Sequence, residues 1–494
     1  MKTLSSKITG ATCALFLALG TFSCQDELLD PVPETLFSDL VVFDTPARIS
    51  LQVNSLYSYV KSGQFLGGRY LVFSDVRADD FINKTSNVVT GTNVWNHTLN
   101  EQSQNDVINT WTAGYAAINQ INVFLAGIDA NAAKYVVPTF PADFATTTVA
   151  NYKGEARLLR ALSYYSLLQL YARPFVDGNG SKPGLPLRLL PESGSTGNDL
   201  ARSTVAEVYA QILEDLDFAE QNLPPTYADA SLRVTRAHRN TATALKTRVY
   251  LTMGNYAKVI EEADKIVPAQ APFVATRGVA NALNASIATV FAVPQETSES
   301  ILSFPFTAQN APGTQNQLGF YFNSEYSLNR EPTAILSNPA WAATDVRRTA
   351  FVTTNAAGTE SLLNRKYPTG SPFTDKAPVI RYAEVMLSLA EARVRTEGAN
   401  DAQALRLLNA VRVRSNPAGA YTSFASVAAA TDAILLERRI EFLGEGIRNI
   451  DIMRFNAPIP GKGSVSAVPP SSPLYVWPIP STELATNRLM VRNE

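Results

Sequence analysis

The clearest structural signal in the sequence is residues 244–267, where two amphipathic helical segments are separated by Gly254 and Asn255. Gly and Asn tolerate the left-handed backbone conformation that a tight turn between helices requires. A single helical hairpin cannot bury its own apolar face, so it must stack on other helices. The candidate partners are residues 111–128, 155–171 and 205–222. This pattern predicts a mainly α-helical scaffold.

Other segments carry the helical period that such stacking needs. Residues 156–171 are apolar around most of a helix, with a polar residue at every third position from Arg157, so we expect this helix to be largely buried. Ser203 and Thr204 are N-cap candidates for a helix that ends near Asn222. Further helices are predicted at residues 379–397, 401–414 and 431–443, the last one ended by Gly444 and Gly446.

Residues 268–378 differ from the rest of the chain because they are rich in Asn, Thr, Gly, Pro and aromatic residues and lack helical period. Long irregular segments inside a compact domain are usually functional loops. The sequence shows no interdomain linker, so the 494 residues are interpreted as a signal segment followed by one mixed domain.

The first residues are typical of an export signal that ends in an acylation site. Residues 1–23 have a basic start and an apolar run at 11–19 that is too short to span a bilayer, and small Ser23 precedes Cys24. This junction resembles a lipobox, in which Cys24 would receive acyl chains such as palmitate. The alternative is that Cys24 is an ordinary cysteine near an ordinary cleavage site. Residues 24–34 are acidic, contain two prolines and are predicted to be an extended tether.

Charge and side-chain inventory exclude several function classes. The chain has 42 basic and 44 acidic residues, a net charge of −2, and therefore no basic field for nucleic acid. Cys13 would leave with the signal segment and Cys24 would be acylated, so no thiol would remain for a disulfide, a nucleophile or a metal. His97 and His238 lie far from a second histidine or cysteine, and no glycine loop for a nucleotide follows a strand. We expect no metal and no cofactor.

Several charged residues lie on otherwise apolar helices and are expected to form buried ion pairs. They are Arg157, Arg160, Glu384, Glu391, Glu437, Arg438 and Glu441. Glu437 and Glu441 share a helix face, and so they could also form the carboxylate pair of a glycosidase. The adjacent Arg438 and Arg439 favour ion pairing instead.

Seven segments, in this order after the acylation signal, resemble the SusD/RagB family. They are residues 111–128, 152–175, 184–188 with 203–224, 244–267, 379–394, 436–455 and 476–487. Within the hairpin, Leu251, Gly254, Tyr256 and Ala263 fall at spacings that resemble a tetratricopeptide repeat. The resemblance implies a mainly α, SusD-like fold over residues 35–494, with tetratricopeptide-like helix pairs as scaffold and a loop-rich ligand-binding face. Its expected parts are residues 35–230, 240–267, 268–378 and 379–494.

The same resemblance implies a function without turnover. Such a protein is a surface-exposed lipoprotein of the outer membrane that binds oligosaccharide or polysaccharide and delivers it to a SusC-like TonB-dependent transporter. One alternative keeps the fold and the transporter but binds peptide or another nutrient. Two further hypotheses are a glycan-cleaving enzyme and a purely structural helical scaffold.

A pyranose presents flat C–H faces and a rim of hydroxyl groups, so its site needs exposed aromatic rings with polar side chains around them. Residues 75–100 supply this mixture, and the resemblance implies that the irregular middle segment contributes as well. The candidate ligand-binding residues are Arg77, Asp79, Trp95, Asn96, Tyr321 and Tyr326. The alternative for each aromatic residue is a loop anchor that packs inward.

Overall fold

The structure is a computed structural model of the chain, and it describes residues 41–194 and 197–493. Contacts divide the chain into two units, Met1–Ser50 and Leu51–Glu494. In the first unit, the described residues 41–50 hold a turn and the beginning of helix α2 (Pro46–Val60). The expected signal segment, the acylation site Cys24 and the tether lie outside the described residues.

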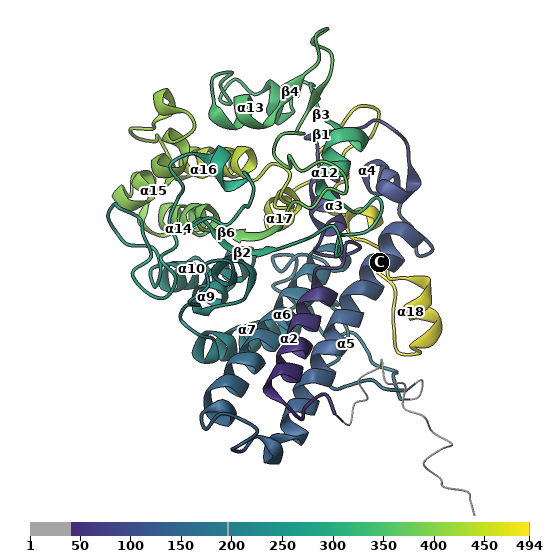
Figure 1. Cartoon of the computed structure of the whole chain (residues 1–494). Coiled ribbons are helices and arrows are strands. Elements are labelled where there is room, and N and C mark those ends of the chain that lie inside the picture. Colours follow the sequence, from purple (N-terminus) through teal and green to yellow (C-terminus); the bar gives the residue numbers. More distant parts are fainter. Residues whose placement is uncertain (1–40, 195–196, 494) are drawn as a thin grey trace, which may run out of the picture. The chain divides into compact units, whose positions relative to one another are not determined.

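Helices dominate the second unit, as expected for a mainly α fold (Figure 1). The longer ones are α5 (Asn109–Ala130), α6 (Val149–Tyr171), α7 (Val205–Asn222), α9 (Arg239–Thr252), α14 (Tyr382–Glu397), α15 (Ala402–Val413) and α16 (Val427–Glu441). The shorter ones are α3 (Arg69–Val76), α4 (Thr92–Asn96), α8 (Leu232–Thr235), α10 (Tyr256–Ala263), α11 (Ile287–Val290), α12 (Leu318–Phe320), α13 (Val346–Phe351), α17 (Arg448–Met453) and α18 (Ser481–Thr486). Among the described residues, no helix is both long and apolar enough to cross a membrane.

The predicted helical hairpin is confirmed as α9 and α10. Gly254 adopts the left-handed conformation with φ of 72°, while Asn255 instead caps α10 by accepting a hydrogen bond from the backbone N–H of Lys258 at 3.3 Å. The hairpin stacks on both sides, because α9 packs on α7 and α10 packs on α14. Contacts continue from α7 through α6 to α5, and from α14 to α15 and α16 (Figure 1).

Helix α6 lies between α5 and α7 and packs on both. Every residue from Gly154 to Tyr171 except Arg157 is buried, which confirms the expectation from its nearly all-round apolar surface. Helix α7, which packs along it, begins at the predicted cap. The Thr204 side chain accepts from the backbone N–H of Glu207, and the Glu207 carboxylate accepts from the Thr204 N–H at 2.7 Å. This capping box satisfies two backbone donors that a helix start otherwise leaves unpaired.

The charged residues on the apolar helices are paired, as predicted. Arg157 and Arg160 share Asp215, Glu384 binds Arg248, Glu391 binds Arg454, and Arg438 binds Asp451. Glu437 binds Arg347 and Arg412, and Glu441 binds Arg347, Arg381 and Arg414. Burial by itself raises the pKa of Glu441, but the guanidinium groups of Arg414, Arg381 and Arg347 outweigh burial and hold this pKa well below its usual range.

The irregular middle segment contains short antiparallel strand pairs. Strands β2 (Ser300–Phe304) and β6 (Ala377–Arg381) pair, as do β4 (Thr353–Thr354) and β5 (Ser361–Leu362). Strand β3 (Tyr326–Leu328) pairs with β1 (Phe81–Asn83). This pairing joins the middle segment to residues 75–100, which we call the N-terminal loop region. Because β1 and β3 are some 240 residues apart in sequence, their pairing brings together the two regions in which ligand residues were expected.

Candidate functional site

The β1 and β3 pair supports the short helix α4, which presents Trp95 and Asn96. Both ends of α4 have left-handed residues, Gly91 with φ of 90° before it and His97 with φ of 56° after it. A Cβ atom at Gly91 would lie 2.6 Å from the ring of Phe73, so only glycine fits against this buried ring. The two tight ends limit α4 to five residues and fix the direction of its side chains.

Trp95 is partly buried and is anchored by its polar edge. Its indole N–H donates to the carbonyl of Phe81 at 2.8 Å. Gly463 lies next to the ring, since a Cβ atom built there would be 3.8 Å from Cη2 of Trp95 and 3.9 Å from Cδ1 of Ile82. The ring is therefore held in one orientation without being covered completely.

Two amide side chains on α4, near Trp95 in the sequence, have unused hydrogen-bonding capacity. The partly exposed Asn96 amide makes no hydrogen bond to any residue that the structure describes, and Asn93 only accepts, at 3.3 Å, from the hydroxyl of Thr98. We call the surface formed by Ile82, Asn93, Trp95, Asn96 and Gly463 the Trp95 face. It combines an apolar ring with free amide donors and acceptors, which is the mixture that a pyranose requires.

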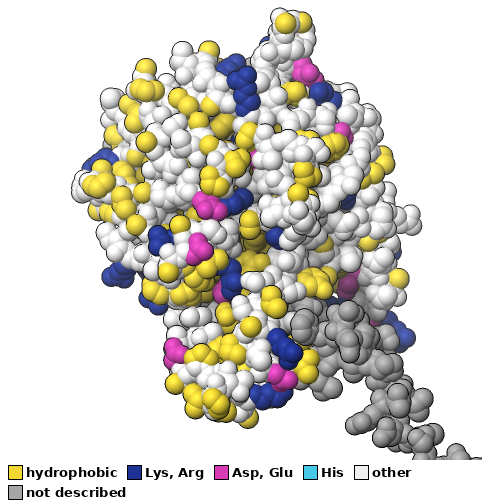
Figure 2. All heavy atoms as spheres, viewed as in Figure 1, with side chains coloured by type: hydrophobic (Ala, Val, Ile, Leu, Met, Phe, Trp, Pro, Cys, Tyr) yellow, Lys and Arg dark blue, Asp and Glu magenta, His cyan; other side chains and the backbone are white. Residues whose placement is uncertain are grey.

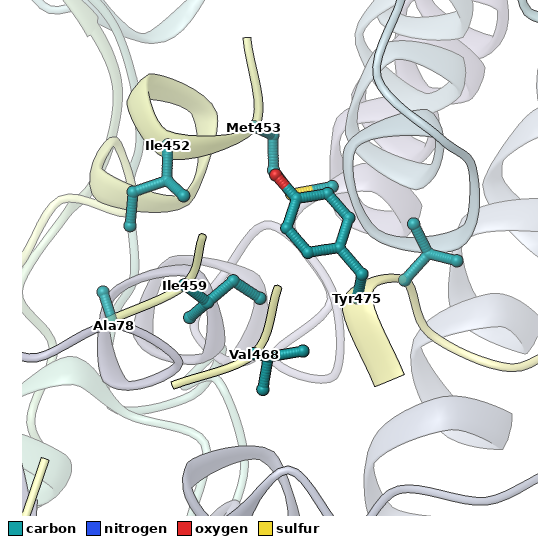
Figure 3. Close-up of a cluster of buried hydrophobic side chains, with 7 residues drawn as sticks. Ala78, Ile452, Met453, Ile459, Val468 and Tyr475 are labelled. Carbon is teal, nitrogen blue, oxygen red and sulfur yellow. The ribbon is translucent and has the colours of Figure 1, made fainter. Parts of the chain in front are cut away.

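A hydrophobic cluster packs the C-terminal segment against the residue that follows α3 and Arg77 (Figure 3). Its members are Ala78, Ile452, Met453, Ile459, Val468, Tyr475 and Val476. Through Ala78, the cluster joins the start of the N-terminal loop region to α17 and to the segment that follows it. Tyr475 also donates its hydroxyl to the carbonyl of Ala457 at 2.7 Å. The turn at 461–464, which contributes Gly463 to the Trp95 face, is thus attached to a packed base.

Arg77 belongs to this base and not to the surface. Its side chain is buried and donates to Oδ1 of Asn449 at 3.1 Å and to the carbonyls of Leu474 and Tyr475. Burial lowers the pKa of Arg77 to about 10. The backbone carbonyl of Arg77 accepts from Nζ of Lys462 at 2.6 Å. Arg77 therefore clamps the C-terminal segment, and a ligand at the Trp95 face cannot reach its guanidinium group.

Asp79 is buried as well and pairs with two arginines. Its carboxylate accepts from Arg439 at 2.9 Å and from Arg448 at 3.4 Å. Its neighbour Asp80 also binds Arg439. The two acidic residues bind the N-terminal loop region, which carries Trp95, to α16 and α17.

Tyr321 and Tyr326 lie in the interior, where both side chains are fully buried. Their rings stack on each other with centroids 6.3 Å apart, and Tyr321 meets the edge of Phe73 at 6.4 Å. The hydroxyl of Tyr326 donates to the carbonyl of Thr90 at 2.8 Å. Both tyrosines are therefore loop anchors that pack inward, which was the alternative to ligand binding, and neither is accessible to a ligand.

The surface charge pattern agrees with the balanced composition. On the face shown in Figure 2, basic and acidic side chains are scattered, and no field of one sign forms. Within residues 41–194 and 197–493, no three His, Cys, Asp or Glu side chains are grouped so that they could hold a metal ion. Burial lowers the pKa of His97 to about 3 and of His238 to about 4, so both histidines are neutral near pH 7.

Two contributors to the Trp95 face were not anticipated from sequence. Ile82 is partly exposed on β1 next to the buried Phe81, and Gly463 lies in a turn whose only signal is its glycine and proline content. The backbone N–H of Gly463 donates to the carboxylate of Glu331 at 3.1 Å, which links this turn to the loop after β3. Turn composition near the C-terminus could have suggested a loop, but its position beside Trp95 depends on tertiary contacts.

Comparison with known proteins gives consistent matches over nearly the whole chain. A family model described as "Starch-binding associating with outer membrane" matches residues 32–251, and one described as "SusD family" matches residues 235–465. SusD-like protein P38 of Formosa agariphila is 22% identical over 98% of both chains.

Solved structures show the same fold. A SusD superfamily protein from Bacteroides fragilis is 32% identical, with a TM-score of 0.79 over 91% of this chain and 99% of its own. One from Bacteroides thetaiotaomicron is 22% identical, with a TM-score of 0.78 over 91% of this chain and all of its own. A laminarin-binding SusD-like protein is 22% identical, with a TM-score of 0.69 over 91% of this chain and 99% of its own. By these matches, the chain belongs to the SusD/RagB family.

Proposed function

We propose that this protein is a lipid-anchored outer-membrane protein that binds oligosaccharide at the Trp95 face and delivers it to a SusC-like TonB-dependent transporter. The observation that carries the proposal is a partly exposed, rigidly held indole ring beside an amide, that of Asn96, with no partner among the described residues. Family membership supports a carbohydrate ligand, since one of the matching family models is described as starch-binding and associated with the outer membrane.

Binding would use the two parts of the Trp95 face differently. The C–H face of a pyranose would stack on the indole ring, and its hydroxyl groups would exchange hydrogen bonds with Asn93 and Asn96. Because the Trp95 N–H is already bonded to Phe81, the ring does not have to be ordered when the ligand arrives. A ring ordered in advance reduces the entropy cost of binding.

The ion pairs of Glu437 and Glu441 support release of an unchanged ligand over cleavage of that ligand. Glu437 and Glu441 are fully buried and bound to arginines, so neither is placed to protonate a glycosidic oxygen. Delivery to a transporter requires that the ligand is held without covalent change and then released. The acylated Cys24 would hold the protein at the membrane, since multiple acyl chains give stable anchoring.

The proposal is tested by affinity electrophoresis of the purified chain in gels that contain starch, laminarin or a uronate-containing polysaccharide. The wild type is expected to be retarded by at least one glycan. Trp95→Ala is expected to weaken binding by about fivefold or more, because aromatic stacking contributes about 1 kcal/mol. Trp95→Phe keeps a ring and should retain part of the affinity.

Phe424→Ala is the matched control, because Phe424 is a partly buried aromatic residue that packs on Tyr421 in another surface loop. It should bind glycan as the wild type does. Retention of full affinity by Trp95→Ala, or equal losses in both alanine variants, would refute the assignment of the Trp95 face. New reducing ends after incubation with glycan would show turnover, and preferential retention of oligopeptides would replace the carbohydrate ligand with a peptide.

A further inference from the structure

A cavity of about 530 Å³ lies apart from the residues of the Trp95 face, between the end of α2, the start of α5 and the loop after β2. Its size falls within the range of about 300 to 1,000 Å³ that small-molecule sites occupy. Its lining includes Ser58, Tyr59, Lys61, Gln64, Phe306 and Asn310. None of these residues is acidic, and one, Lys61, is basic.

Lys61 has an unusual environment for a buried cation. Its side chain is only 9% exposed, and Nζ donates to the carbonyl of Pro305 at 2.7 Å. The ammonium group also lies 4.9 Å from the ring centroid of Phe306. No carboxylate in the described part of the chain pairs with it, and burial lowers its pKa without any compensating charge.

The other buried lysines of the described residues lie near carboxylates; even Lys462, whose Nζ binds only a backbone carbonyl, is close enough to Asp79 and Asp80 for their charges to raise its pKa against burial. Lys246 binds Glu262 at 2.8 Å, and Lys366 binds Glu445 at 2.7 Å. Burying a charge without an opposite charge destabilises a fold, so an unpaired ammonium group at a cavity wall indicates a partner that is not part of the chain. Of the ammonium group's three donors, only one is used by Pro305.

The walls of the cavity are fixed by close backbone contacts. A Cβ atom at Gly63 would lie 2.0 Å from the carbonyl oxygen of Pro312, and one at Gly68 would lie 1.8 Å from that of Asn316. Only glycine permits this approach at either position. The loop that carries Phe306 is therefore held against the turn between α2 and α3.

The chemistry of the lining selects one class of occupant. Tyr59, which is 43% exposed, and the partly exposed Phe306 offer apolar ring surfaces. Hydroxyl and amide groups of Ser58, Gln64 and Asn310 offer hydrogen bonds to sugar hydroxyls. A carboxylate would complete the hydrogen bonding of Lys61 and neutralise its charge.

We propose that this cavity is a second saccharide site that binds the carboxylate-bearing pyranose of an acidic glycan, such as a uronic acid residue, with Lys61 as the carboxylate-binding residue. This inference rests on the proposed carbohydrate-binding function. It extends that function by a separate site and by a preference for charged over neutral sugar.

The test compares tri-galacturonate with its methyl ester by isothermal titration calorimetry, because the ester removes the charge and keeps the rings. The wild type is expected to bind the acid about tenfold more tightly than the ester, as one charge-assisted hydrogen bond implies. Lys61→Met, which keeps the apolar stem, should lose this preference. Lys182→Met is the control, because Lys182 is exposed and its loss changes the net charge equally.

Thr112→Trp is a second variant, which fills the cavity from the exposed side of α5 and leaves Lys61 in place. It should abolish the preference for the acid even if Lys61→Met fails to fold. Equal affinity of the wild type for acid and ester, or an undiminished preference in Thr112→Trp, would overturn the proposal. Tighter binding of hexaglutamate than of tri-galacturonate would also overturn it, in favour of an acidic peptide.

Trp95→Ala separates this inference from the proposed function. If both sites exist, Trp95→Ala keeps the preference for tri-galacturonate while losing affinity for neutral glycan. If the second site is wrong, Trp95→Ala abolishes binding of the acid and Lys61→Met has no effect. If the proposed function is wrong, the wild type binds neither the saccharides nor any glycan in the gels.

Discussion

Asp106 offers a quantitative test of the buried polar interior near Tyr321 and Tyr326. It lies in the turn of helix at Gln104–Ile108 that leads into α5, and its side chain is fully buried. Neither carboxylate oxygen has a hydrogen-bond partner among the described residues. Burial raises the pKa of Asp106 from 3.8 to about 7, with a smaller opposing effect from Arg69.

The direction of the pH dependence follows from this raised pKa. Below pH 3.8 the carboxyl group is protonated in both the folded and the unfolded chain. With respect to Asp106, the free energy of unfolding is then at its highest. Between pH 3.8 and about 7 the unfolded chain releases the proton while the folded chain keeps it, so stability falls as pH rises. Above pH 7 both forms are ionised and the loss stays constant.

From pH 5 to pH 7 the loss is about 1.4 kcal/mol per pH unit, or about 2 to 3 kcal/mol in all. Asp106→Asn removes this titration. The melting temperature of the variant relative to the wild type is therefore expected to rise by about 2 to 3 °C between pH 5 and pH 8, because unfolding a chain of this length carries an entropy of about 1 kcal/mol per kelvin.

Differential scanning fluorimetry at pH 5, 6, 7 and 8 measures this difference. Burial also raises the pKa of Asp75 to about 7, so the wild-type profile alone mixes both residues, whereas the difference between variant and wild type isolates Asp106. Asp129→Asn, at an exposed ion pair with Lys153 on α5, is the control for replacing a carboxylate by an amide at the surface. A difference for Asp106→Asn that is constant or shrinks with rising pH would refute the reasoning.

Three further perturbations test other parts of the structure. Glu441→Ala leaves three buried arginines without their shared carboxylate and should lower the free energy of unfolding by about 3 to 5 kcal/mol in a urea titration; a loss below about 1 kcal/mol would contradict the network. Gly91→Val forces a side chain into a left-handed conformation against Phe73, so it should lower the melting temperature by about 2 °C or more and weaken glycan binding together with it. Cys24→Ser should abolish incorporation of labelled palmitate and move the protein from the membrane to the soluble fraction, and an unlabelled wild type would refute the acylation.

The helical scaffold was predictable because its signals are local. The periodicity at 244–267 gave the hairpin, and the apolar surface of 156–171 gave a buried helix, although α6 begins earlier, at Val149. Ion pairing of Glu437 and Glu441 followed from the cost of burying unpaired charge. Each of these inferences uses residues that are close together in the sequence, so no knowledge of the tertiary structure was needed.

The candidate site was less predictable because its surroundings come from distant segments. Arg77 and Asp79 look like loop residues in sequence, but their partners Tyr475 and Arg439 are about 400 and 360 residues away. Tyr321 and Tyr326 are buried because a long irregular segment needs its own apolar packing beneath it. Of the residues named from sequence, Trp95 and Asn96 remain accessible to a ligand.

Hydrogen–deuterium exchange with and without the glycan that retards the wild type most strongly locates the ligand directly. Bound saccharide at the Trp95 face should slow exchange at residues 92–98 and 461–464, and exchange in the α9 and α10 hairpin should stay unchanged. Protection confined to segments outside the Trp95 face, with residues 92–98 exchanging at the same rate in both samples, would contradict the proposed site.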